Sequence, residues 1–200
     1  MTTLVAIQHD DWCIIAADSQ STANYRAFDT SPVGKINKNG NYLIAAAGSG
    51  RGANILAFDW EPPTIPSRVD LDKFVTKTLI PSMRKKFIAS GHELKGDGIA
   101  SSFDNELLIA IRGTIYHIFE DYSWERCGTK LYATGSGGDY ALGALYALGA
   151  DECDDYEEAI ELVEQAVKIA TKLDIYSGGL IQVAVQNPQS KSMLATLEQK

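Results

Sequence analysis

The chain begins MTTLVAIQHDDWCIIAADSQST, residues 1–22, and this stretch decides how the rest of the fold is predicted. The segments LVAIQ and WCIIAAD are rich in apolar residues, and Asp10 and Asp11 separate them, so they are predicted to pair as a hairpin. Thr2 stands directly before the first strand, and Asp18 ends the second. Chain termini are usually frayed, so a threonine tied this closely to a strand calls for a functional explanation.

The overall composition favours one globular unit that does not bind nucleic acid. The chain has 200 residues, of which 45% are hydrophobic and 22% charged, and this suits a single domain over residues 1–200 with one sizeable core. The formal net charge is −8, whereas phosphate binding needs clustered Lys and Arg. We interpret the acidity as a contribution to solubility.

Cysteine and histidine usage restricts the compartment and the chemistry. Cys13, Cys127 and Cys153 are too few and too widely spaced for a disulfide framework, so a reducing, cytoplasmic location is expected. No signal peptide or bilayer-spanning stretch is visible, so no membrane association is expected. The three histidines lack metal-ligand spacing to cysteine or acidic residues, so neither a metal nor a cofactor is expected.

Strand hairpins dominate the rest of the pattern. Asn39-Gly40 is a strong hairpin turn signal, Asp70 is expected to cap a long helix that Pro81 kinks or divides, and residues 19–33 are polar and predicted to form a loop. Strands are predicted at residues 4–9, 12–18, 33–37, 41–48, 105–113, 114–120, 130–135, 178–188 and 192–198, and helices at 51–60, 71–87, 139–149 and 155–173.

The order of these elements predicts the fold class. Strands, two helices, strands, two helices and further strands follow one another, with hairpins rather than single strand–helix–strand crossovers. This order predicts an α+β fold of four layers, an αββα sandwich in which two antiparallel sheets lie between helix layers. The acidic run DECDDYEE, residues 151–158, is interpreted as a helix N-terminus rather than as a metal site.

Two glycine-rich turns each follow a predicted strand and precede a predicted helix. They are GSGRG at residues 48–52 and GSGG at residues 135–138. Such turns present backbone N–H groups to an anion, which is compatible with a dinucleotide site, with an oxyanion hole or simply with tight packing of a strand against a helix. The dinucleotide interpretation lacks the parallel unit and the acidic residue that its fingerprint requires.

Five segments together resemble the proteasome β-type subunits and the bacterial peptidase HslV, which are N-terminal nucleophile hydrolases. The segments, in chain order, are TTLVAIQHDDWCIIAADSQST, VGKI, AAAGSG, LYATGSGGDYALGAL and DIYSGGLIQV. The resemblance extends over nearly the whole length of the chain. The resemblance implies the αββα fold that the pattern of elements also predicts. It further implies hydrolysis of peptides or unfolded proteins inside homo-oligomeric stacked rings, with a separate ATPase as the unfolding partner.

The resemblance implies a catalytic group made up of Thr2, Asp18, Lys35 and Gly48. A hydroxyl nucleophile needs an adjacent base, and a terminal residue carries one in its own α-amine, whose reference pKa is about 7.7–8.0. Lys35 would favour the neutral amine through its positive charge, Asp18 would orient Lys35, and the Gly48 N–H would stabilise the oxyanion. Lys38 is the alternative lysine for this role.

A polar network around the terminal amine is implied in the same way. Its expected members are Ser136, Asp174 and Ser177. Asp174 also stands at the predicted C-terminal end of a helix, where the helix dipole disfavours an acid. A specific hydrogen-bond partner for Asp174 is therefore expected.

The resemblance also implies how a peptide substrate binds. The backbone of Thr22 and Gly50 would pair with an extended peptide, as a strand added to an edge. Val33 and Ala46 would line the pocket for the residue before the scissile bond.

The implied mechanism requires removal of Met1, because only then does Thr2 carry a primary amine. A small second residue such as threonine usually permits removal by methionine aminopeptidase. A chain that keeps Met1 would instead be a catalytically silent ring subunit, since an amide nitrogen cannot act as a base. A nucleotide-binding protein that uses the two glycine turns is the remaining alternative.

Overall fold

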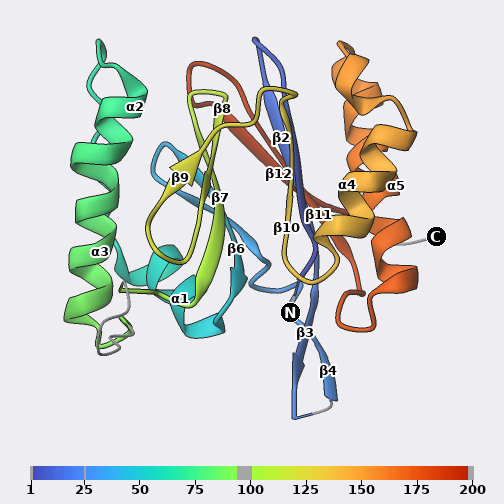
Figure 1. The fold of residues 1–200 in the computed structure, drawn as a ribbon, viewed down its shortest axis with the longest axis horizontal. Coiled ribbons are helices and arrows are strands. Elements are labelled where there is room, and N and C mark those ends of the chain that lie inside the picture. The colour runs from blue at the N-terminus through green and yellow to red at the C-terminus, as the bar shows by residue number, and fades with distance from the viewer. Residues whose placement is uncertain (1, 25, 94–100, 198–200) are drawn as a thin grey trace.

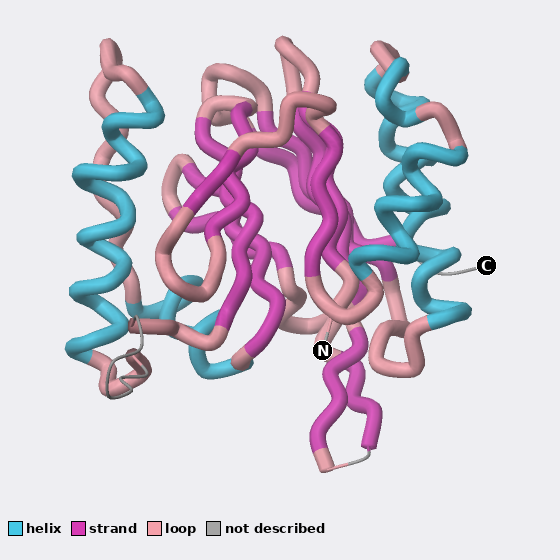
Figure 2. Tube along the Cα trace, viewed as in Figure 1, coloured by secondary structure: helices cyan, strands magenta, loops and turns pink. Residues whose placement is uncertain are grey.

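The computed structural model describes residues 2–24, 26–93 and 101–197. Two β-sheets stand face to face in the centre of the molecule, and helices cover the outer face of each sheet (Figure 1 and Figure 2). The predicted four-layer αββα fold is therefore confirmed. Within the described residues, no helix is both long enough and apolar enough to cross a bilayer.

The first sheet contains the start of the chain and has the strand order β10-β1-β2-β11-β12, with all neighbours antiparallel. The predicted opening hairpin is confirmed, since Leu4 lies opposite Ala17. The strands are β1 (Leu4–Gln8), β2 (Cys13–Asp18), β10 (Leu131–Thr134), β11 (Ile181–Gln186) and β12 (Ser192–Leu197). Its outer face is covered by α4 (Gly138–Ala147) and α5 (Tyr156–Leu173), with the short 3-10 helix η3 (Ala150–Glu152) between them.

The second sheet has the order β5-β6-β7-β8-β9 and is also antiparallel throughout. Its strands are β5 (Ile36–Asn39), β6 (Tyr42–Gly48), β7 (Asn105–Ile111), β8 (Thr114–Ile118) and β9 (Trp124–Glu125). The helical segments on its outer side are α1 (Gly50–Asn54), η1 (Ile55–Asp59), α2 (Leu71–Phe74), η2 (Val75–Leu79) and α3 (Ile80–Ala89). Strand β9 was not predicted from the sequence, because it is only two residues long.

Strand β1 shows why its apolar residues are continuous rather than alternating with polar ones. Val5 and Ile7 pack in the core beneath α4 and α5, whereas Leu4 and Ala6 pack in the core between the two sheets, with Leu43 of β6. A strand that is buried on both faces has no polar side to present. The start of the chain is thus anchored at the centre of the sandwich.

The predicted loop over residues 19–33 is wrong. The chain forms a hairpin of β3 (Gln20–Ala23) and β4 (Arg26–Asp29), in which Thr22 lies opposite Ala27. The hairpin extends beyond the body of the molecule (Figure 1). Its residues are half-buried or exposed, so the segment lacks the alternating apolar pattern by which a strand is recognised in sequence.

The strand predicted over residues 33–37 begins later than expected. The carbonyl oxygen of Thr30 accepts hydrogen bonds from the N–H groups of Val33 at 3.0 Å and Gly34 at 2.7 Å, and Gly34 has φ +74°. These contacts close a turn that a left-handed glycine permits. Lys35 therefore stands directly before β5, where the turn meets the sheet.

Pro81 does not divide the long helix. Asp70 caps it as predicted, its carboxylate accepting a hydrogen bond from the Lys73 N–H at 3.1 Å. Segments α2, η2 and α3 then follow one another without a non-helical residue. The π-helical segment η2 ends two residues before Pro81, and we attribute it to the missing proline N–H, since i→i+5 bonding locally replaces the regular pattern.

Candidate active site

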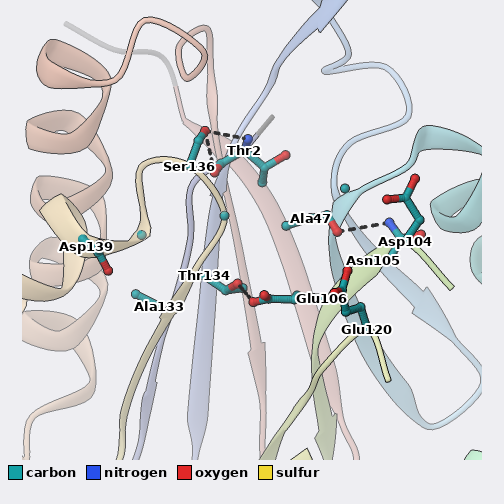
Figure 3. A pocket seen from close by; sticks show the side chains of 13 residues that line it. Thr2, Ala47, Asp104, Asn105, Glu106, Glu120, Ala133, Thr134, Ser136 and Asp139 are labelled. Carbon is teal, nitrogen blue, oxygen red and sulfur yellow. Dashed lines mark hydrogen bonds between the residues drawn. The ribbon is translucent and has the colours of Figure 1, made fainter. Parts of the chain in front are cut away.

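Thr2 lies two residues before the start of β1 and is held by the turn at residues 135–138. The backbone nitrogen of Thr2 donates to Ser136 Oγ at 3.3 Å (Figure 3). The Thr2 carbonyl oxygen accepts from the Gly137 N–H at 3.4 Å. Only 4% of Thr2 is exposed. Gly135 has φ +87°, and a Cβ added there would overlap the Thr2 carbonyl oxygen. The turn therefore needs glycine in order to approach the start of the chain.

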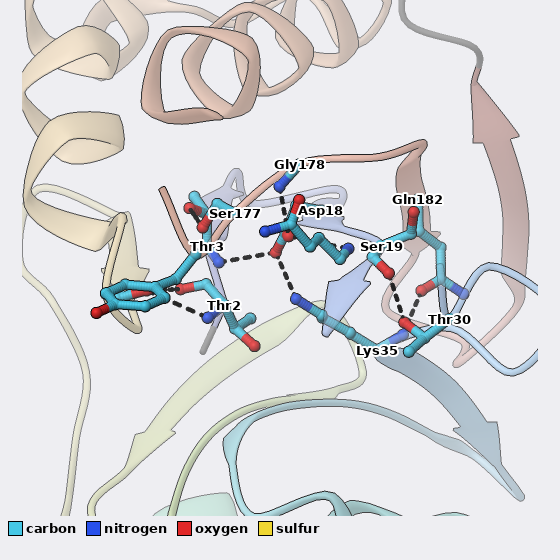
Figure 4. Close-up of polar contacts among 12 residues, drawn as sticks. Thr2, Thr3, Asp18, Ser19, Thr30, Lys35, Ser177, Gly178 and Gln182 are labelled. Carbon is cyan, nitrogen blue, oxygen red and sulfur yellow. Dashed lines mark hydrogen bonds and ion pairs between the residues drawn. The ribbon is translucent and has the colours of Figure 1, made fainter. Parts of the chain in front are cut away.

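Asp18 is a fully buried carboxylate that accepts four hydrogen bonds. Its Oδ1 accepts from the Thr3 N–H at 2.9 Å and from Lys35 Nζ at 2.6 Å, and its Oδ2 accepts from the N–H groups of Gln20 at 3.1 Å and Gly178 at 2.9 Å (Figure 4). A buried charge is tolerated only when it is paired and hydrogen-bonded. Asp18 thus connects the residue after Thr2 to the lysine predicted beside it.

Lys35, and not the exposed Lys38, meets Asp18. Burial lowers the pKa of the Lys35 ammonium below its usual 10.5, although the Asp18 carboxylate opposes this effect. The Lys35 side chain is 9% exposed and pairs with Asp18, so the group is partly stripped of water close to the start of β1. Such an environment is typical of lysines that influence the protonation of a neighbouring group.

Gln182 of β11 fixes the backbone at Lys35 and was not predicted from the sequence. Its Oε1 accepts from the N–H groups of Lys35 and Ile36, each at 2.8 Å, and its Nε2 donates to the Ile36 carbonyl at 2.9 Å. Gly34 leaves room for this amide, because a Cβ there would lie 2.6 Å from Gln182 Oε1. A buried polar residue inside the apolar strand GGLIQVAVQ was the available signal.

Asp174 forms the polar network predicted around Thr2. Its Oδ2 accepts from Ser136 Oγ and Ser177 Oγ, both at 2.6 Å, and its Oδ1 accepts from the Tyr176 N–H at 3.1 Å. Burial alone would raise the pKa of Asp174, but these hydrogen bonds outweigh burial and hold the pKa below 3.8. The specific partners expected for an acid at the end of α5 are therefore present.

The turn at residues 48–52 lies across a cavity from the turn at residues 135–138. Gly48 has φ +113°, and the Ser49 N–H donates to the Asp104 carbonyl at 3.0 Å. A Cβ on Gly48 would overlap this carbonyl oxygen and lie 3.0 Å from the Asn105 Cα. Only glycine fits this backbone.

Two cavities meet at Thr2 and Gly48 and differ in chemistry. One, of about 610 Å³, is lined by Ser136 and by four acidic residues, Asp104, Glu106, Glu120 and Asp139 (Figure 3). The other, of about 390 Å³, is mostly apolar and is lined by Pro32, Val33, Ala46 and Ala53 among others, with Lys35 at its edge. An extended chain could thus pass Thr2 from one cavity to the other.

The structure brings most of the predicted substrate-binding residues to the apolar cavity. Val33, Ala46 and Gly50 line it. Thr22 does not, and its neighbour Ser21 lines the cavity instead. Thr22 lies in β3, whose second edge carries no paired strand among the residues that the structure describes.

The αββα fold with a threonine at the start of its first strand defines the class of the N-terminal nucleophile hydrolases. The proteasome subunit family model matches residues 113–186. The chain is 31% identical over 185 residues to the ATP-dependent protease subunit HslV of Borrelia duttonii (strain Ly), covering 90% of this chain and 94% of the relative. It is 28% identical over 184 residues to HslV of Caldanaerobacter subterraneus subsp. tengcongensis, covering 91% and 96%.

A solved structure agrees with these relatives. BPH of Thiobacillus denitrificans, in complex with epoxomicin, is 25% identical with a TM-score of 0.73, covering 92% of this chain and 98% of that chain. The chain therefore belongs to the family of HslV peptidases and proteasome subunits. The predicted family, fold and peptidase class are confirmed by these matches.

Proposed function

We propose that this chain is a threonine peptidase subunit in which Thr2, freed by removal of Met1, is the nucleophile. Met1 itself lies outside the described residues. The position of Thr2 is the observation that supports the proposal. Its nitrogen lies 3.3 Å from Ser136 Oγ, and the N–H of Thr3 donates a hydrogen bond to Asp18. Two cavities are lined by Thr2. Kinship with subunits named ATP-dependent protease HslV supports the same reaction.

The proposed reaction uses the Thr2 amine as the base. The amine takes the proton of the Thr2 hydroxyl as Oγ attacks the carbonyl carbon of the peptide bond, and the Gly48 N–H stabilises the oxyanion that forms. When the C–N bond breaks, the ammonium returns the proton to the leaving amine, and the acyl group remains on Thr2 Oγ as an ester. Water then gives a proton to the amine as it attacks the ester carbonyl carbon. When the ester C–O bond breaks, the ammonium returns this proton to Thr2 Oγ, and the carboxylic acid is released.

The surrounding charges suit this proton transfer. Lys35, held by Asp18 at 2.6 Å, places positive charge near the amine and favours its neutral form. Ser136 accepts from the Thr2 nitrogen and donates to Asp174, so the same hydroxyl orients the amine. Ser177 completes this network through Asp174 and Thr3. We assign these residues to orientation and proton balance, and nucleophilic attack to Thr2 alone.

The apolar cavity is proposed to hold the residue before the scissile bond. Val33 and Ala46 line it, as this role requires. The backbone of Gly50 stands at the same cavity, and Thr22 lies in an edge strand that can accept an added peptide strand. The substrate is therefore an extended peptide or an unfolded protein segment.

We further propose that the chain assembles into stacked homo-oligomeric rings in the cytoplasm and works with a separate ATPase. The relatives' description as subunits of an ATP-dependent protease supports this assignment. Leu173 and Ile175, close to the site, are 58% and 79% exposed and offer an apolar surface to a neighbouring subunit. The cysteines are free, and burial raises the pKa of the Cys13 thiol to about 12, which suits an inert thiol in a reducing compartment.

Kinetics of two variants test the proposed nucleophile. T2A removes the hydroxyl, so turnover of a fluorogenic peptide should fall to background. T2S keeps a hydroxyl and an amine at the same place and should retain measurable turnover. Both small residues permit removal of Met1, so processing is matched. Turnover by T2A equal to that of the parent would overturn the assignment.

A further inference from the structure

Asn105 contacts the peptide group before Gly48 and the peptide group between Ser49 and Gly50. It is the first residue of β7, lies opposite Gly48 in the sheet and is 2% exposed. Its Nδ2 donates to the Ala47 carbonyl oxygen at 3.1 Å and to the Ser49 carbonyl oxygen at 3.0 Å. The two N–H groups of one amide thus hold the backbone carbonyls of the residues before and after Gly48.

The planarity of the peptide bond gives this contact a consequence for the site. The carbonyl of Ala47 and the N–H of Gly48 belong to one planar trans unit, so fixing the oxygen fixes the direction of the hydrogen. The carbonyl of Ser49 and the N–H of Gly50 are related in the same way. Asn105 therefore sets the orientation of the oxyanion donor and of a backbone group proposed to bind the peptide.

The Asn105 amide makes its hydrogen bonds through the two N–H donors of Nδ2 and not through its Oδ1 acceptor. Two carbonyl acceptors require the NH₂ end of the side chain, which determines the orientation of the amide. Its buried Oδ1 has no hydrogen-bond partner among the described residues, although an unsatisfied buried acceptor is costly. Gly52 leaves the space that Oδ1 occupies, because a Cβ there would overlap this oxygen.

We infer that Asn105 is a positioning residue that orients the N–H group of Gly48 for stabilisation of the oxyanion. This inference rests on the proposed function. A carbonyl bond of this kind preorganises the donor before charge develops, so its loss affects the transition state more than the ground state. The signature is a lower kcat with little change in KM.

The test uses the nearly isosteric variant N105D in the assembled, processed enzyme. This substitution replaces both donors by oxygen at neutral pH, and we expect kcat for a fluorogenic peptide to fall about 10- to 100-fold with KM within about threefold. Q186E is the matched control. Gln186 is a fully buried amide at the C-terminal end of β11. It accepts a hydrogen bond from the Gly113 N–H and donates one to the Asn41 carbonyl, both at 3.1 Å. Its kcat should stay within about twofold.

A pH profile separates positioning from loss of stability. Protonation gives the carboxyl of N105D an O–H donor, so the ratio of its kcat to that of the parent should rise as the pH falls from 8 to 5.5. Should N105D fail to assemble, G52A tests the same contact, since its methyl group would displace Oδ1; its kcat should fall at least tenfold.

Three results would overturn the inference: a kcat of N105D or G52A within twofold of the parent, a loss confined to KM, or an equal loss of kcat in Q186E. An inactive parent or an active T2A would instead contradict the proposed function. The two failures are therefore distinguishable.

Discussion

The two glycine turns have nearly the same sequence and different environments. The turn at residues 135–138 wraps the backbone of the threonine pair: Gly135 abuts the Thr2 carbonyl, and Gly137 abuts the Thr3 hydroxyl. Within the described residues, no hydrogen bond joins the turn at residues 48–52 to Thr2 or Thr3, and Asp104 and Asn105 hold this turn from behind. One turn fixes the start of the chain, and the other leaves Gly48 facing the cavities.

A GSG turn after a strand therefore has no fixed role. The role depends on which segment lies against it, and that segment is distant in sequence in both cases. Substitutions of single glycines can separate the two roles, because each turn contains two glycines without space for a Cβ and one glycine with space.

The largest effect is expected for G135A. A Cβ at this position would lie 2.9 Å from the Thr2 carbonyl carbon, in a backbone with φ +87°. Overpacking costs about 1–3 kcal/mol, and left-handed backbone at a non-glycine residue costs about 1–2 kcal/mol. We expect both a lower free energy of unfolding, measured by urea denaturation, and peptide turnover near background. Parent-like turnover in this variant would contradict the anchoring role of the turn.

A smaller but more selective effect is expected for G48A. Its φ of +113° and the Asp104 carbonyl oppose a side chain there, so the N–H should shift away from the oxyanion. Loss of one such donor lowers kcat about 10²- to 10³-fold. Steady-state kinetics should show this loss of kcat. Urea denaturation should show a smaller decrease in the free energy of unfolding than for G135A. Equal decreases in stability would remove the distinction between the two turns.

The Asp174 network should show itself as a pH-dependent contribution to stability. A carboxyl group whose folded pKa is lowered stabilises the fold above its ordinary pKa, here 3.8, and this contribution disappears as the pH falls through the folded value. D174N should therefore be less stable than the parent at pH 7, with the gap closing below about pH 4. Urea unfolding at several pH values measures this gap, and a gap independent of pH would refute the account.

The smallest effects are expected at the glycines with space. Nothing lies within 4 Å of a Cβ at Gly50, and a Cβ at Gly138 would make ordinary contacts at 3.5 Å with Ala133. G138A should leave turnover within about twofold and stability within about 0.5 kcal/mol. G50A should leave stability unchanged but raise KM, since Gly50 lines the apolar cavity. A loss of stability in G50A would show that the turn is less open than described.

The sequence predicted the elements that carry continuous or periodic apolar residues. The opening hairpin, the helix capped by Asp70 and the helix that starts after Asp155 were all found in this way. The hairpin of β3 and β4 was missed because its side chains are mostly polar and are half-buried or exposed, with none fully buried. Its pairing is made by the backbone, which leaves no side-chain signal.

The candidate site was predictable where a motif carried it and not where a distant contact did. Asp18, Lys35 and Asp174 stand in segments that resemble the family, and the structure brings Asp18 to Lys35 and Asp174 to Ser136. Gln182 accepts a hydrogen bond from the N–H of Lys35, although 147 positions separate the two residues in the sequence. No spacing rule connects such pairs before the sheets are placed.

The proposed role of Thr2 as the nucleophile is tested most directly by mass spectrometry of the N-terminal peptide from the assembled protein. The peptide is analysed once without substrate and once after mixing with substrate and a rapid acid quench. We predict that this peptide begins at Thr2 and that, after the quench, it carries the acyl part of the substrate. The T2A variant should show the same processing without the acyl group. A peptide that begins at Met1, or an acyl group on another residue, would contradict the account.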